Sequence, residues 1–216
     1  IGNLLGETAY AALTNSTPII LILNSVAMGA TNGVSILLSQ AIGANEKEKT
    51  EKMIMTSLTV AIIFSFGVTI LLEVFLKPIL VLLHTTDEIM QSAYQYLAIY
   101  VLGYLAVYLY CYFTAVLRSF GNSVFQVIAM LICTLLNAVL DPLFIHYLGF
   151  KGAAIATVAS QSICLIFMLA YLYKKQFFKL RLSYFDRTLV VPFIIKGIPS
   201  AFQQSIPAIS TSFLTS

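Results

Sequence analysis

Charged residues are scarce in this sequence. Asp, Glu, Lys and Arg together make up 10% of its 216 residues, against roughly 25% in an ordinary soluble domain. A water-exposed globular surface cannot be built from so few charges, which excludes a soluble enzyme and a soluble binding domain. The formal net charge of +3 is also too small to indicate a nucleic-acid partner.

Signatures of metal binding and of catalysis are missing as well. The three cysteines, Cys111, Cys133 and Cys164, lie in separate apolar stretches. They lack the short paired spacing of a zinc site and the density of a disulfide scaffold, so they are interpreted as small hydrophobic residues. No glycine-rich phosphate loop, HExxH pattern or nucleophile elbow occurs. The sequence therefore gives no enzyme signature and implies no cofactor.

Apolar residues, in contrast, make up 59% of the chain, and the mean hydropathy is +0.92. This excess is spread over the whole length, so neither a signal peptide nor a single anchor explains it. Each apolar stretch is about as long as the roughly 20 residues that cross a bilayer, and lipid-exposed backbone of this length must be helical. The sequence thus predicts an all-α polytopic membrane protein. The predicted spans are 14–42, 53–72 with an apolar continuation to Leu83, 94–117, 123–147, 152–173 and 189–216.

The basic residues lie mostly in alternate connections, which predicts an orientation. The connections 43–52, 118–122 and 174–187 hold three, one and five Lys or Arg residues, nine in all. The connections on the other side hold only Lys77 and Lys151. Because basic loops stay cytoplasmic, we expect these three connections to face the cytoplasm and the protein to lie in the cell membrane. The connections expected to face outward are 1–13, 84–93 and 148–151.

Asp141 is the one acidic residue that lies well inside a predicted span. A carboxylate at such a depth is costly and marks a functional site by default. Asn137 precedes it by one helical turn on the same face, and Pro142 cannot donate a hydrogen bond to the carbonyl of Ala138. This patch predicts a binding site for a coupling proton, or for Na⁺, which is a hard cation that prefers oxygen ligands. The alternative is a neutral carboxyl that only fixes helix packing.

Thr157 should lie at the depth of Asp141. Asp141 comes six residues before the outer end of its span, and Thr157 comes five residues after the next span begins. Gln161 follows Thr157 by one turn and faces the same way, so we expect a polar cluster between the two helices. Gln161 is also a candidate for the substrate cavity. Ordinary hydroxyl-mediated packing between helices is the alternative for Thr157.

Tyrosines recur every four residues in the third predicted span. The stripe drifts by about 40° per step on a helix with 3.6 residues per turn, so it stays broadly on one side. Tyrosine faces attract organic cations, which makes Tyr100, Tyr104 and Tyr108 candidates for a substrate cavity. Plain packing is the alternative, and the Tyr96 end could belong to the interfacial belt. The stripe consists of Tyr96, Tyr100, Tyr104, Tyr108 and Tyr112.

Several short segments, in their order and spacing, resemble the multidrug and toxic compound extrusion (MATE) family of cation-coupled antiporters. The segments are Gly2–Glu7 with Ala11–Leu13, Ser39–Ala44, Leu117–Asn122, Leu136–Asn137 with Asp141–Pro142, Gly149–Thr157 and Gly197–Pro199. The resemblance implies two six-helix lobes around a cavity that opens alternately to either side of the membrane. It also implies that Asn137, Asp141 and Thr157 match the family's amino-lobe site for protons or sodium.

In this frame residues 1–173 form an amino-terminal lobe that lacks its first helix and holds helices two to six. Residues 174–188 form the basic interlobe linker, and 189–216 form the truncated first helix of the second lobe. Since Ile1 is not a start methionine and the chain ends in an apolar run, we expect a fragment whose partner is the rest of its own chain. The family's other amino-lobe acid would precede Ile1. Where one branch of the family carries a glutamate in helix seven, this chain has Pro207, so we expect coupling to rest on the amino lobe.

The resulting functional hypothesis is an antiporter that uses H⁺ or Na⁺ to export organic, cationic or amphiphilic compounds. A lipid-linked oligosaccharide flippase on a related scaffold is the nearest alternative, but its cavity would need Lys or Arg to receive a phosphate. A membrane enzyme should place paired His, Asp or Glu groups at one membrane face, and none is found. A membrane subunit without transport activity is the remaining alternative.

Overall fold

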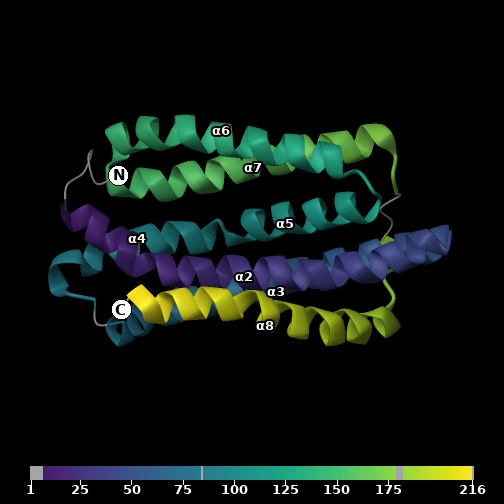
Figure 1. The fold of residues 1–216 in the computed structure, drawn as a ribbon, viewed down its shortest axis with the longest axis horizontal. Coiled ribbons are helices and arrows are strands. Elements are labelled where there is room, and N and C mark those ends of the chain that lie inside the picture. The colour runs from purple at the N-terminus through teal and green to yellow at the C-terminus, as the bar shows by residue number, and fades with distance from the viewer. Residues whose placement is uncertain (1–6, 84, 179–181, 216) are drawn as a thin grey trace.

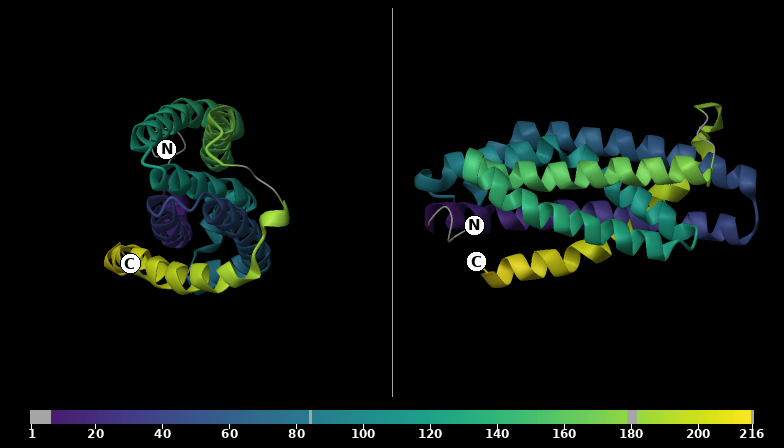
Figure 2. Two further views of the ribbon diagram at one scale, coloured as in Figure 1. Left: turned by 90° about the vertical axis from the view of Figure 1, so that its right-hand side faces the viewer. Right: turned by 90° about the horizontal axis from the view of Figure 1, so that it is seen from above.

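The computed structural model describes residues 7–83, 85–178 and 182–215, and within them the chain is helical without a strand. The helices run side by side in an elongated bundle (Figures 1 and 2). The most extensive contacts join α2 to α8 and α6 to α7. The helices are α2 (Glu7–Gly43), α3 (Lys47–Leu82), α4 (Asp87–Leu102), α5 (Tyr104–Ser119), α6 (Ser123–Leu148), α7 (Phe150–Lys175) and α8 (Val190–Thr215), with the short 3₁₀ helices η1 (Leu182–Tyr184) and η2 (Arg187–Leu189) before α8.

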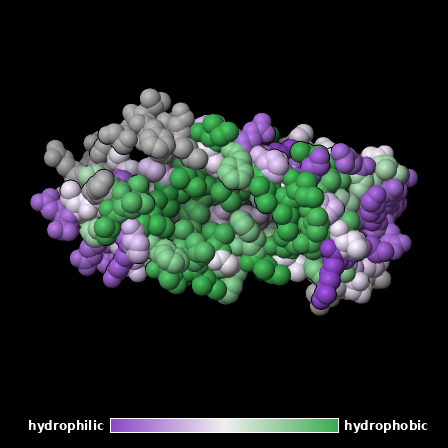
Figure 3. Space-filling model, turned by 90° about the horizontal axis from the view of Figure 1, so that it is seen from below, coloured by the Kyte–Doolittle hydropathy of each residue, from purple (hydrophilic) through white to green (hydrophobic). Residues whose placement is uncertain are grey.

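The helices confirm the predicted all-α membrane architecture. Within α2, α3, α6 and α7 lie four stretches long and apolar enough to span a membrane, and α4 with α5 passes the same test as one bent pair. The surface accordingly shows a broad hydrophobic belt between two hydrophilic ends (Figure 3). The sixth predicted span is helical as α8, but within the described residues it does not meet this criterion. Its polar residues include Lys196, Gln203 and Gln204.

Three helices begin six or seven residues before their predicted spans, α2 at Glu7, α3 at Lys47 and α4 at Asp87, and one predicted span is broken. Residues 7–13, expected to belong to a connection, already form the first turns of α2, which continues through Pro18. The preceding part of that predicted loop, residues 1–6, lies outside the described residues. The third predicted span is two helices, because α4 ends at Leu102 and α5 leaves at an angle of 47°. The tyrosine stripe is therefore divided between α4 and α5 instead of following one helix.

Gly103 provides the physical reason for this break. A Cβ atom at this position would lie 2.3 Å from Cγ2 of Val158, so α7 packs against the backbone where a side chain would otherwise stand. The hydroxyl of Thr69 on α3 donates a hydrogen bond to the carbonyl oxygen of Val101 at 3.3 Å. A neighbouring helix thus binds a backbone carbonyl at the break, as hydrocarbon surroundings require.

The connection between α7 and α8 is held against the end of the bundle that carries most basic residues. The rings of Phe177 and Phe178 lie 5.2 Å and 6.2 Å from the ring of Phe120, between centroids. Further along, the backbone N–H of Asp186 donates to the hydroxyl of Thr56 at 3.0 Å. Residues 179–181 of the predicted linker lie outside the described residues. The described parts bring the chain from α7 across to the start of α8.

Glycines let α2 and α8 cross with their backbones in contact. A Cβ atom at Gly29 would lie 2.3 Å from Cα of Ala201, and one at Gly33 would lie 2.8 Å from Cα of Gly197. Both helices thus present small residues four apart, the spacing that allows close crossings between membrane helices. Hydropathy does not reveal this pair of motifs, because each lies inside a span that is apolar over most of its length.

Gly29→Ala should destabilise the fold because the added methyl group has no space at the crossing. Overpacking of this kind costs about 1–3 kcal/mol. Gly67→Ala is the matched control, since a Cβ atom on this glycine in the interior of α3 would meet nothing within 4 Å and alanine favours helix by up to about 1 kcal/mol. Thermal unfolding of the purified protein in detergent measures both. Equal midpoints for the two variants would contradict the close crossing of α2 and α8.

Candidate functional site

A one-residue turn joins α6 to α7 and fixes how their side chains meet. Gly149 is both the C-cap of α6 and the N-cap of α7, with φ of 65° and ψ of −147°. Residues other than glycine rarely adopt a positive φ of this kind. Three residues later, a Cβ atom at Gly152 would lie 2.2 Å from the carbonyl oxygen of Phe144. The end of α6 and the start of α7 are therefore in backbone contact, and the two helices run antiparallel.

This turn brings the three predicted coupling residues together. The Nδ2 amide of Asn137 lies 3.5 Å from Oδ1 of Asp141 and 3.4 Å from Oγ1 of Thr157, and it donates to both. The hydroxyl of Thr157 in turn donates to the carbonyl oxygen of Ala153 at 3.0 Å. The two amide contacts are longer than the usual 2.7–3.2 Å. All three side chains are half-buried, so the patch is a loosely closed polar site between α6 and α7.

Gln161 lies one turn beyond this patch without joining it. Its Oε1 atom is buried and has no hydrogen-bond partner within the described part of the chain. A buried carbonyl oxygen without a donor is costly, so this atom would be stabilised by a hydrogen-bond donor. Gln161 thus lies one turn further along α7 than Thr157, and its Oε1 accepts no hydrogen bond from the described residues.

Tyr96 reaches the patch from α4, which the sequence analysis did not predict. Its ring stacks on Phe150 at the start of α7, with centroids 4.9 Å apart and planes at 23°. The side chain is 6% exposed and lies within electrostatic range of Asp141. The sequence offered Tyr96 only as part of the stripe or of the interfacial belt. The bend between α4 and α5 at Gly103 could not be read from it.

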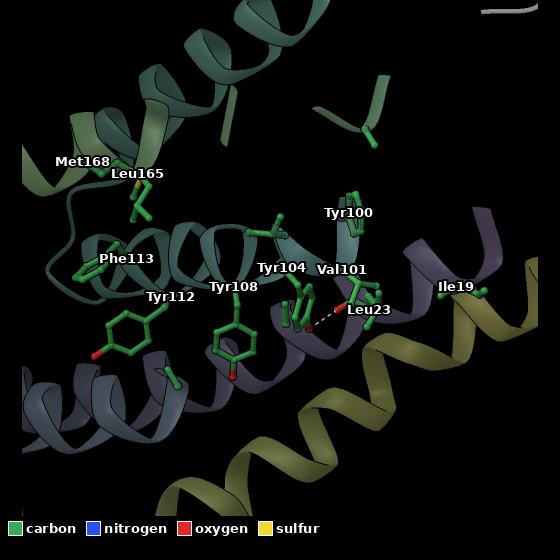
Figure 4. Close-up of a cluster of buried hydrophobic side chains, with 14 of the residues drawn as sticks. Ile19, Leu23, Tyr100, Val101, Tyr104, Tyr108, Tyr112, Phe113, Leu165 and Met168 are labelled. Carbon is green, nitrogen blue, oxygen red and sulfur yellow. Dashed lines mark hydrogen bonds between the residues drawn. The ribbon is translucent and has the colours of Figure 1, made fainter. Parts of the chain in front are cut away.

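The other tyrosines of the stripe lie in the packing of the bundle (Figure 4). Tyr100 is 1% exposed and donates to Oδ1 of Asn24 at 3.0 Å. Tyr104 is fully buried and donates to the carbonyl oxygen of Leu23 at 2.9 Å. Tyr108 instead lines an apolar cavity between α2, α3, α5 and α8. Of these three candidates for a substrate cavity, Tyr108 is the one that borders this apolar cavity.

The patch can hold a proton or a small ion but lacks the donors of a transition-metal site. Asp141 is its only carboxylate, and no group of three His, Cys, Asp or Glu side chains in the described residues could hold a metal ion. Its polar atoms belong to a carboxylate, an amide and a hydroxyl. Such a set can exchange a proton with water or supply oxygen ligands to a hard cation. The cysteines are free, with Cys164 buried and Cys111 and Cys133 half-buried.

Comparison with known proteins identifies relatives along the whole chain. The MatE family model matches residues 1–143. The probable multidrug resistance proteins YoeA and YpnP of Bacillus subtilis (strain 168) are 28% and 31% identical over 222 and 212 residues. These alignments cover 97% and 95% of this chain but 48% and 47% of the relatives. A FAD transporter of Shewanella oneidensis is 28% identical over 74% of this chain. The chain thus spans about half the length of the curated relatives that it matches.

Solved structures show the same fold. A crystal structure of MATE in the bent conformation superposes with a TM-score of 0.91 at 26% identity, covering 99% of this chain and 49% of that one. A multidrug resistance MATE family transporter of the MOP superfamily in its outward-facing conformation gives a TM-score of 0.89, also at 26% identity, over 97% of this chain and 48% of that one. The described bundle therefore corresponds to one half of such a protein.

Thr157→Val should change stability only slightly, because the contact from Asn137 is long. Hydrogen bonds between membrane helices contribute about 0.6 kcal/mol on average. Thr134→Val is a matched control, since Thr134 is exposed on α6 and bonds only to the carbonyl of Met130 within its own helix. Unfolding in mixed micelles measures both free energies. A loss above about 2 kcal/mol for Thr157→Val alone would mean that this hydroxyl serves helix packing.

Proposed function

The chain belongs to the MatE family, and from this premise we propose that it forms one lobe of a cation-coupled antiporter that exports organic compounds by alternating access. It is a multi-pass membrane protein, and its matched relatives are named as probable multidrug resistance proteins and as a FAD transporter. One observation carries the proposal of coupling. The carboxylate of Asp141 is joined through Asn137 to Thr157 on the neighbouring helix.

This arrangement can link an ion-binding event to helix packing. A proton on Asp141 would remove the negative charge that attracts the amide of Asn137, and a cation would compete with that amide for the carboxylate. Either event changes the interaction between α6 and α7 at the depth where Asn137 bridges them. An ion that binds one packing of the helices better than another shifts the population between them, and coupling to export requires no more than this difference in affinity.

The orientation of Asn137 favours a proton over Na⁺ as the coupling ion. Its amide presents Nδ2 to both Asp141 and Thr157, whereas a sodium ion between these residues would need the amide oxygen turned inward. A donor beside a carboxylate is compatible with a group that gains and loses a proton. Sodium coupling is the alternative, and it would require the amide to rotate.

The charge distribution favours cationic or amphiphilic substrates. No Lys or Arg among the described residues is buried, so the inside of this half offers no cation to a phosphate. A lipid-linked oligosaccharide flippase is therefore not favoured. Asp141 supplies a negative charge inside the bundle, and the unpaired Oε1 of Gln161 supplies an acceptor. Both suit a substrate that carries N–H groups or a positive charge.

In this proposal the described helices belong to the amino-terminal lobe and its connection to the next one. Residues 1–173 form that lobe, 174–188 the linker and 189–216 the first helix of the second lobe. The connections 43–52, 118–122 and 174–187 face the cytoplasm because they hold most of the basic residues. The partner is the second lobe, consistent with the half-length matches to relatives. The protein acts as a transporter without a catalytic step.

Asp141→Asn should abolish ion-driven export while leaving the protein folded. Asparagine keeps the shape of the side chain but can neither take up a proton nor supply the negative charge of the carboxylate. The export rate of a fluorescent organic cation is measured in proteoliposomes across which an ion gradient is imposed. Asp87→Asn, at the start of α4, is the control that keeps coupled export. Wild-type ion-driven export by Asp141→Asn would refute coupling at this residue.

A proton gradient alone should drive export, and a sodium gradient alone should not. The two gradients are imposed separately on proteoliposomes that contain the complete transporter, with ethidium as the exported cation. Asn137→Ala should reduce proton-driven export because Asp141 loses its link to α7. If only the sodium gradient drives export, the proposed coupling ion is wrong and the amide oxygen of Asn137 becomes the expected ligand.

A further inference from the structure

An apolar cavity of about 290 Å³ lies outside the proposed ion site. Its walls come from α2, α3, α5 and α8, whereas Asp141 and Thr157 belong to α6 and α7. The rings of Tyr108 and Tyr112 project from α5 toward this side of the bundle (Figure 4). The cavity is therefore a separate feature, and its function does not depend on the proposed coupling at Asp141.

The lining of this cavity selects against charged and strongly polar occupants. None of its lining residues is charged. The hydroxyls of Ser57 and Tyr112 are hydrogen-bonded to each other at 2.8 Å, and Tyr112 also donates to the carbonyl of Ile54 at 2.9 Å. Tyr108 packs edge-on against Tyr104, and its ring lies 5.7 Å from the ring of Phe64. An organic cation would find no counter-charge here, so an uncharged hydrocarbon group is the better fit.

The cavity opens between α3 and α8 toward the apolar outer surface. Its exposed lining residues are on these two helices, with Phe64 40%, Ile194 45% and Ile198 52% exposed. On the other side the cavity is closed by the contact of α2 with α8, where Gly33 and Gly197 meet backbone to backbone. Figure 3 shows that the outer surface of this face is a hydrophobic belt. Lipid chains of the bilayer surround such a belt.

The depth of the cavity matches the hydrocarbon of one leaflet. Gly197 lies seven residues from the start of α8, and Val60 lies seven residues from Met53, where α3 becomes apolar; each interval is about 10 Å of helix. Half of a bilayer core is about 15 Å thick. Both helices therefore place the middle of the cavity within the leaflet on the basic side of the molecule, while Phe64 and Ala201, eleven residues in, reach about the bilayer midplane. Its volume is at the lower end of the roughly 300–1,000 Å³ typical of small-molecule pockets, which suits a slender chain.

We infer that this cavity binds an acyl chain of a phospholipid from the leaflet on the basic side. The chain enters between Phe64 and Ile198 and ends against the rings of Tyr108 and Tyr112. Because the occupant touches α2, α3 and α5 of one lobe and also α8, it stabilises the contact between α8 and that lobe. The cavity is thus a lipid site between the helix bundle and α8, separate from the site that holds the coupling ion.

Tryptophan fluorescence tests this inference directly, since the 216 residues contain no tryptophan. Tyr108→Trp places the reporter in the cavity wall. Tyr104→Trp is the matched control, one turn earlier on α5, fully buried and outside the cavity. The complete protein is reconstituted in phosphatidylcholine with or without brominated acyl chains, and the emission of the parent protein is subtracted. Bromine quenches indole on contact, so emission should fall for Tyr108→Trp and stay constant for Tyr104→Trp.

A second substitution shows whether quenching comes from the cavity. Val60→Phe, added to Tyr108→Trp, fills the cavity and should restore emission. Val74→Phe makes the same change on the lipid-facing side of α3, where the side chain is 68% exposed, and should not. No quenching at position 108, equal quenching at 104 and 108, or quenching unaffected by Val60→Phe would each overturn the inference. So would emission at 108 that responds only to an exported compound, because substrate would then be the occupant.

Thermal stability provides a readout that does not need the tryptophan variants to fold. A ligand that binds only the folded protein raises its unfolding midpoint. Adding phosphatidylcholine to the complete protein in detergent should therefore raise the midpoint of the parent and of Val74→Phe. The increase should be smaller for Val60→Phe. An equal increase for both variants would contradict a lipid chain in this cavity.

Discussion

In a hydrocarbon solvent, apolar side chains gain little from leaving lipid for one another, so helices associate where their backbones can approach closely. Three such approaches organise this bundle. Gly29 and Gly33 admit α8 to the surface of α2, Gly103 admits Val158 of α7, and Gly152 brings α7 onto the end of α6. Lipid can cover the remaining helix surfaces, as can the second lobe in the proposed transporter, which explains why so many large apolar side chains are exposed.

These contacts also determine where polar atoms meet. Because the end of α6 is in contact with the start of α7, Asn137 can bridge Asp141 and Thr157. Because α4 and α5 diverge at Gly103, Tyr96 turns toward Asp141 while Tyr104 lies against the backbone of α2. A single straight helix would have kept these two tyrosines in one stripe. The same bend thus separates a polar site near α6 from an apolar cavity beside α3.

The sequence predicted those features that depend on local composition or on counting along the chain. Hydropathy placed the spans to within a few residues at most boundaries, and the depth argument for Asp141 and Thr157 agrees with their shared contact to Asn137. The break at Gly103 was missed because the contact that leaves no space for a side chain there comes from Val158, 55 positions later in the chain. The crossing of α2 and α8 was missed for the same reason, since a glycine shows a close approach only when its neighbour is known.

The turn at Gly149 limits how this half of the protein can vary. Asp141 and Thr157 are each eight residues from Gly149, on opposite sides of it. One inserted residue on the α7 side would rotate Thr157 by about 100° relative to α6 and raise it by about 1.5 Å, which would end its contact with Asn137. Longer surface connections such as 174–188 can gain or lose residues at little cost. Over evolutionary time, then, the length of this turn should be inherited unchanged even where most of the surrounding lipid-facing side chains are replaced.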